Sequence, residues 1–196
     1  MTSDLDLQFI KDTFKGLRRK FELTERTSDI SSRYMDFLDK ALLLSHYRSI
    51  DYYNAYCFKT SDNYEGMLFT ILVLYSIRSG KFDIGGYDIQ LLALRELPHP
   101  YGHILIRPET VTDKISEWFQ HIETDFPANP GFSGNNYFLS DNKMLSNEFA
   151  TQKRLSGIEK HRDIYIEING DIMMAKFQRN INFTDGCSLI ELMKEI

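Results

Sequence analysis

The sequence predicts an α+β protein: two N-terminal helices, then a largely antiparallel sheet of about seven strands with three further helices packed on it. Apolar residues recur at helical spacing near the N-terminus, and a long, doubly apolar run follows in the middle. Near the C-terminus, alternating isoleucines lead into an Asn-Gly turn. With 196 residues, we expect one domain, helical over 1–50 and sheet-containing over 51–196.

The amino-acid composition is that of an ordinary globular protein. Hydrophobic residues make up 42% of the chain and charged residues 26%, which is ordinary globular usage and argues against disorder. The formal net charge of −5 gives no electrostatic reason to bind nucleic acid. The N-terminus does not resemble a signal peptide, and the two cysteines, Cys57 and Cys187, are read as buried structural thiols. We therefore expect a cytoplasmic protein.

The first predicted helix covers residues 5–22 and is amphipathic. Its apolar positions recur at steps of three and four residues, as on one helix face: Leu7, Ile10, Phe14, Leu17 and Phe21. Four of the cations between them form a candidate membrane or partner surface: Lys15, Arg18, Arg19 and Lys20. Such a face suits an anionic membrane or an acidic partner, but a helix packed on the domain with a solvated face has the same pattern.

A second helical pattern runs from Ile30 to Leu42, and three strands should follow it. Residues 52–59 form the first strand. Residues 67–78 are apolar on both alternating sets, which is typical of a strand covered on both faces. Residues 81–94 run back beside it, and the pair Gly85-Gly86 predicts a β-bulge there.

Prolines bracket a short central strand, Ile104 to Ile106, which we expect at a sheet edge or in a crossover. A helix bearing Trp118 should follow Pro108. Next we expect a loop over 125–136, a strand over 137–139, and a helix from Asp141 toward residue 157 with a kink near Thr151.

Ile164, Ile166 and Ile168 alternate up to Asn169-Gly170, the strongest short hairpin signal. If these two residues form the loop, Ile168 lies opposite Asp171 and Ile166 opposite Met173. One face then belongs to the core. The other, which includes Glu167 and Lys176, is either partly covered or an association surface. Thr184-Asp185 is expected to cap a last helix with an apolar stripe.

Four polar side chains near the central strand are weak candidates for a binding site: His103, Arg107, Glu109 and Tyr137. An enzyme of unrecognised type would need a pocket that brings them together. His99 and His103 lie four residues apart, about 13 Å in an extended chain, so we expect no shared metal. No cofactor fingerprint is present, and no catalytic residue is assigned.

Short segments of the second half carry a family resemblance: Leu97-Pro98, Ile106 to Glu109, Asp125-Phe126, Phe132-Ser133, Tyr137 to Leu139 and Ile166 to Met173. Over about residues 66–194 the chain resembles a family of uncharacterised bacterial domains that often sit behind membrane helices on the cytoplasmic side. The resemblance implies a fold and a compartment, and no activity. This chain departs from the family in having no membrane helix.

Three functions remain open. The first is a non-catalytic binding or regulatory module in a bacterial cytoplasm, whose partner is another protein or a second copy of the chain. The second is peripheral attachment to a membrane through helix 5–22. The third is an enzyme of unrecognised type.

Overall fold

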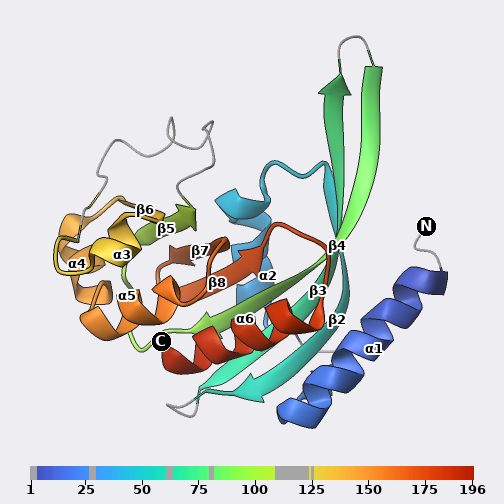
Figure 1. Ribbon diagram of the computed structural model, residues 1–196, viewed down its shortest axis with the longest axis horizontal. Coiled ribbons are helices and arrows are strands. Elements are labelled where there is room, and N and C mark those ends of the chain that lie inside the picture. The colour runs from blue at the N-terminus through green and yellow to red at the C-terminus, as the bar shows by residue number, and fades with distance from the viewer. Residues whose placement is uncertain (1–3, 27–29, 61–63, 80–81, 109–123, 125) are drawn as a thin grey trace.

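The computed structural model describes residues 4–26, 30–60, 64–79, 82–108, 124 and 126–196. They form an α+β fold around one eight-stranded sheet in which all neighbouring strands are antiparallel (Figure 1). The strands are β1 (Thr24–Arg26), β2 (Ser49–Lys59), β3 (Glu65–Ser79), β4 (Phe82–Glu96), β5 (His103–Pro108), β6 (Asn136–Ser140), β7 (Ile164–Asn169) and β8 (Ile172–Phe177). Their spatial order is β1-β2-β3-β4-β8-β7-β5-β6.

Helices cover both faces of the sheet. They are α1 (Asp4–Lys20), α2 (Ser32–Lys40), the 3-10 helix η1 (Leu42–Leu44), α3 (Pro130–Ser133), α4 (Lys143–Phe149), α5 (Gln152–Glu159) and α6 (Phe183–Glu195). The α1 face of the sheet packs against α1, α3, α4, α5 and α6. The α2 face packs against α2 and η1.

Strand β3 shows why the sheet is buried on both sides. Its residues Phe69, Ile71 and Val73 contribute to the core of the α2 face. Leu68 and Leu72 contribute to the core of the α1 face. Successive side chains of a strand point to opposite faces, so a run that is apolar at every position needs cover on both. The prediction of cover on both faces is confirmed from Met67 to Val73, but it is wrong for the end of the strand, where Leu74 and Ser76 are exposed.

The predicted α+β class with an antiparallel sheet is confirmed, but the N-terminal part is not purely helical. The short strand β1 lies between α1 and α2 and pairs with β2 through Thr24–Arg26. The sheet therefore has eight strands instead of about seven. The side chains of β1 are all exposed, so no alternating apolar pattern marked it in the sequence.

The predicted β-bulge at Gly85-Gly86 is wrong. Strands β3 and β4 pair in continuous register from Gly66↔Arg95 to Ser79↔Phe82. Gly86 lies opposite Tyr75, and a Cβ atom on Gly86 would come within 2.7 Å of the Tyr75 ring. The glycine makes room for an aromatic side chain, and the register shift lies in β2 instead, between Tyr52 and Asn54.

The predicted C-terminal hairpin is present, with a different register. Asn169 pairs with Ile172, so the two loop residues are Gly170 and Asp171, and Ile166 faces Ala175 instead of Met173. Gly170 has φ +65°, while Asp171 is not among the described residues with positive φ. Positive φ at the first loop residue alone is the pattern of a type II′ turn. Because the shift is two residues, each side chain keeps its predicted face.

Strand β5 lies between β7 and β6, so of the two predicted positions, sheet edge or crossover, the crossover is the one found. The predicted helix with Trp118 falls outside the described residues. The predicted loop over 125–136 contains the short helix α3. The kink expected near Thr151 is a break between α4 and α5, where the Thr151 side chain accepts a hydrogen bond from the Arg154 N–H. The last helix, α6, is confirmed, but the predicted cap is wrong: the N-cap is Asn182, and Thr184-Asp185 lies in the first turn of the helix.

Candidate functional site

Helix α1 is held on the sheet by its apolar stripe. Ile10, Phe14 and Leu17 are buried in the α1 face, and the Phe14 ring stacks on Tyr56 of β2 at 4.2 Å between centroids. On the side of α6, a Cβ atom at Gly16 would come within 2.9 Å of the Phe183 ring. Helix α1 therefore packs between β2 and α6, and this packing determines the direction in which its polar side chains point.

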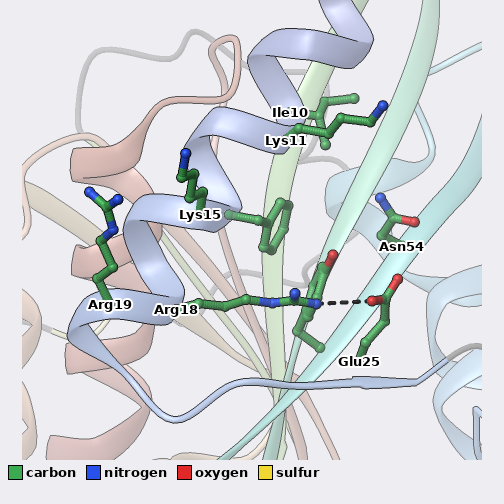
Figure 2. A pocket seen from close by; sticks show the side chains of 9 residues that line it. Ile10, Lys11, Lys15, Arg18, Arg19, Glu25 and Asn54 are labelled. Atoms are coloured by element: carbon green, nitrogen blue, oxygen red, sulfur yellow. Dashed lines mark hydrogen bonds and ion pairs between the residues drawn. The ribbon is translucent and has the colours of Figure 1, made fainter.

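A groove of about 600 Å³ runs between α1 and the outer strands β1 and β2 (Figure 2). It is lined by Ile10, Lys11, Phe14, Lys15, Arg18, Arg19, Glu25, Asn54 and Tyr56. Four of these side chains are cations and one is a carboxylate, in a chain whose net charge is −5. The groove is therefore a local basic site on an acidic protein, and we call it the basic groove.

Arg18 forms the best-defined contact in the basic groove. Its Nη2 atom lies 2.9 Å from Oε2 of Glu25, and its guanidinium sits over the Tyr56 ring, 5.0 Å from the centroid. Figure 2 shows Arg18 reaching across the groove to Glu25, with Lys11 extended toward the strands. Burial, and then the charge of Glu25, raise the pKa of Tyr56, so its hydroxyl stays protonated at neutral pH.

The other three cations of the groove, Lys11, Lys15 and Arg19, have no acidic partner among the residues that the structure describes. Unpaired surface cations gathered on one side of a helix attract anions. Together with Arg18, these cations follow one another along α1 at steps of four, three and one residues. This spacing places them on the same flank of the helix. The basic groove can therefore bind a polyanion.

Three of the four cations predicted as a surface, Lys15, Arg18 and Arg19, line the groove. Lys20 does not, because its Nζ atom lies 2.6 Å from Oε1 of Glu191 on α6. The surface predicted from the sequence does not include Lys11. The sequence did contain a signal for Lys11: it precedes Lys15 by four residues, and Lys15 precedes Arg18 by three, which places the three side chains on one side of the helix. Lys20 falls on another side of the same helix.

The other predicted site residues are only partly brought together. Arg107 sits over the ring of Tyr137, its cross-strand partner, at 4.9 Å from the centroid. His103 lies four residues away along the same strand, about 13 Å, and its Nε2 atom is 2.9 Å from Oε1 of Glu167. Glu109 falls outside the described residues. His99 is engaged elsewhere, with its Nε2 atom 2.8 Å from the Tyr101 hydroxyl.

Glu167 of β7 is a buried carboxylate that links the α2 face of the sheet to the 3-10 helix η1. Its two oxygens accept hydrogen bonds from the backbone N–H groups of Leu42 and Leu43, each at 2.9 Å. Together with His103, these donors satisfy the carboxylate. The face of the hairpin that carries Glu167 and Lys176 is therefore covered by η1 and its neighbours rather than exposed for association.

Lys176 is another buried charge on the α2 face. Its Nζ atom donates to the Tyr47 hydroxyl at 2.8 Å, and that hydroxyl donates to Oε1 of Gln90 at 3.0 Å. Burial lowers the pKa of Lys176 to about 7. Burial, and then the charge of Lys176, lower the pKa of His46 to about 4. Lys176 and Gln90 are buried and Tyr47 is half-buried, and we interpret the network as structural.

Both cysteines are buried, as expected, and burial raises the pKa of each thiol. Within the described part of the chain, no three metal-ligating side chains gather. Nor does any described helix combine the length and apolar character needed to cross a bilayer.

No family model, curated protein or solved structure matches the chain. The resemblance of residues 66–194 to uncharacterised bacterial domains therefore stays a prediction, and so does the cytoplasmic location. The function has to be argued from the basic groove itself.

Proposed function

We propose that the protein is a non-catalytic binding module that holds an acidic segment of a partner protein in the basic groove. The observation that carries the proposal is that four cations and a single carboxylate line the groove. Opposite charges across an interface steer encounter and set register. An acidic partner therefore gains from this surface despite the protein's net charge of −5.

The arrangement favours an extended segment over a single small anion. Along the helix axis, Lys11 and Arg19 are separated by about 12 Å, at 1.5 Å per residue. That distance matches about four residues of an extended peptide. The aromatic side chains Phe14 and Tyr56 line the groove as well, but they are buried, so the cations supply most of the surface that a ligand contacts.

The test uses a fluorescein-labelled hexaglutamate peptide and fluorescence anisotropy at low salt. We expect binding that weakens steeply with added salt, because exposed charges are screened. The variant Lys11→Gln/Lys15→Gln removes two exposed charges of the groove, and we expect it to bind about tenfold more weakly.

The matched control is Lys143→Gln/Lys153→Gln, which removes two exposed lysines outside the residues lining the groove. Net charge changes by the same amount in both variants. If the two double variants lose affinity equally, the attraction comes from overall charge and the proposed site is wrong. Absence of binding by the wild-type protein at low salt also contradicts the proposal.

A second candidate function is attachment to an anionic membrane surface. Leu5 and Phe9, near the start of α1, are 82% and 50% exposed. They could enter the headgroup region while the cations contact anionic lipid. Within the apolar stripe, Ile10, Phe14 and Leu17 are already buried against the sheet and Leu7 is 38% exposed, so the apolar surface for insertion is confined to the first turns of α1.

Sedimentation with vesicles decides between the two. A membrane protein of this kind sediments with phosphatidylglycerol vesicles at low salt, and the variant Leu5→Ser/Phe9→Ser stays in the supernatant. If wild-type protein fails to sediment with these vesicles, the membrane function is excluded and peptide binding is unaffected.

A further inference from the structure

Resting on the proposed function, we infer that Glu25 is an internal competitor for the ligand. Its carboxylate occupies Arg18 in the position that a carboxylate of the bound acidic segment takes. Arg18 is then the residue that selects carboxylates, and Glu25 has to leave it when the ligand binds.

The first step of the argument is the chemistry of the contact. An arginine and a carboxylate form a charge-assisted hydrogen bond, here at 2.9 Å between Nη2 of Arg18 and Oε2 of Glu25. An aspartate or glutamate of a partner offers the same two oxygens. The groove thus contains one example of the group that it is proposed to bind.

The second step concerns how firmly each member of the pair is held. The Arg18 guanidinium rests on the ring of Tyr56, which is buried and stacked on Phe14. Glu25 belongs to β1, a strand of three residues whose side chains are all exposed. The arginine is therefore oriented by packing, while the glutamate can turn away without disturbing a core.

The third step compares the contact with its surroundings. The side chains of Arg18 and Glu25 are 46% and 44% exposed, and ion pairs in such positions are weak. Lys11, Lys15 and Arg19 lie beside Arg18 without an acidic partner among the described residues. A ligand with several carboxylates contacts all four cations at once, so it displaces a lone glutamate.

The chain supplies a matched control for Glu25. Glu65 pairs with Arg26 of the same strand β1, with Oε1 of Glu65 at 3.0 Å from Nη2 of Arg26. Those two side chains are 53% and 42% exposed, close to the values for the pair in the groove. The variants Glu25→Gln and Glu65→Gln each remove one negative charge and one ion pair of β1, but only Glu25 lines the groove.

The test measures binding of labelled hexaglutamate to wild type, Glu25→Gln and Glu65→Gln by anisotropy at low salt. We expect Glu25→Gln to bind about three- to tenfold more tightly than wild type, because Arg18 becomes available to the ligand without competition. Glu65→Gln should stay close to wild type. In an Arg18→Gln background, the gain from Glu25→Gln should disappear.

Equal affinities of Glu25→Gln and Glu65→Gln would overturn the inference while leaving the groove as the binding site. The same holds if the gain persists without Arg18, since it would then be a general charge effect. If neither wild type nor Glu25→Gln binds the peptide, the proposed function fails with it.

Discussion

At the scale of single residues, Lys176 shows how a cation is accommodated in this core. Its ammonium group is buried and donates a hydrogen bond to the Tyr47 hydroxyl. Desolvation disfavours the charged form, and this lowers the pKa of Lys176 from 10.5 to about 7. In the unfolded chain the lysine keeps its ordinary pKa, so the two states hold different numbers of protons between these values.

We therefore expect Lys176 to make stability depend on pH. Between about pH 7 and 10.5 the unfolded chain carries a proton that the folded protein lacks, so the free energy of unfolding rises with pH, by at most ~1.4 kcal/mol per unit. Lys176→Met should remove this slope and be more stable than wild type at pH 7, where the buried charge costs most.

Urea unfolding of both proteins at pH 7, 8 and 9 checks this expectation. The stability difference between Lys176→Met and wild type should shrink as pH rises. Titration of Cys57 and Cys187 affects both proteins equally and cancels in the difference. Parallel pH profiles would contradict the lowered pKa of Lys176.

Glu167 and Lys176 lie buried on the α2 face, and their burial could not be predicted. Glu167 and Lys176 alternate with apolar neighbours in β7 and β8, so the sequence left their face undecided. What decides it is a covering segment that lies far away in the sequence, namely Leu42, Leu43 and Tyr47. Three of the four basic residues of the groove, Lys15, Arg18 and Arg19, were in contrast predicted from the sequence of α1, because one helix sets their geometry.

At the scale of elements, the β7–β8 hairpin shows that a turn motif predicts the position of a hairpin but not the register of its two strands. The Asn-Gly signal located the turn correctly. It predicted a loop at Asn169-Gly170, whereas the loop is Gly170-Asp171. A glycine suits the first position of one tight turn and the second position of another, so the motif alone fixes the hairpin and leaves two registers.

The substitution Asn169→Thr distinguishes these registers, and Gly170→Ala tests the backbone conformation of the loop. Gly170 has φ +65°, and the space that a Cβ atom would occupy there is open, so Gly170→Ala costs only the backbone strain of that conformation, about 1–2 kcal/mol. Asn169 lies in the strand, and Asn169→Thr should leave stability unchanged or slightly higher. Chemical denaturation midpoints check both, and a clear loss for Asn169→Thr would favour the Asn-Gly loop.

At the scale of the whole molecule, the sheet consists of two parts joined along one seam. Strands β1 to β4 follow one another in sequence and in space, and β8, β7, β5 and β6 form the second part. The seam is the pairing of β4 with β8 from Leu92↔Lys176 to Glu96↔Ile172. Arg95 strengthens it by donating from Nη1 to the Met193 carbonyl near the end of α6, at 2.6 Å.

The far ends of β3 and β4 project beyond the seam and beyond β2 (Figure 1). Tyr75, Ser76, Gly85 and Gly86 pair only with each other among the described residues. A two-stranded ribbon is marginal on its own. We expect amides of Tyr75 and Ser76 to exchange with deuterium much faster than those of Leu68 to Val73, in native-state hydrogen exchange. Equal protection would mean that the ribbon has another partner.

The class of fold followed from local pattern, and the strand order did not. Helical spacing, a doubly apolar strand and a hairpin motif are properties of short windows. The position of β5 between β7 and β6 depends on pairing across long stretches of chain, which no window contains. The three residues of β1 lack any apolar alternation, and they join the sheet because β2 offers them an edge.

The seam also has a consequence for biosynthesis. A ribosome makes β1 to β4 early, while β8, which pairs with the inner edge of β4, is made near the end of the 196 residues. Until then, the backbone N–H and C=O groups of Leu92 and Leu94 on the side that β8 later occupies are unpaired, and any other extended chain can pair with them. Growing polypeptides on one messenger are close neighbours, so the interval before β8 emerges is when this protein most needs a chaperone.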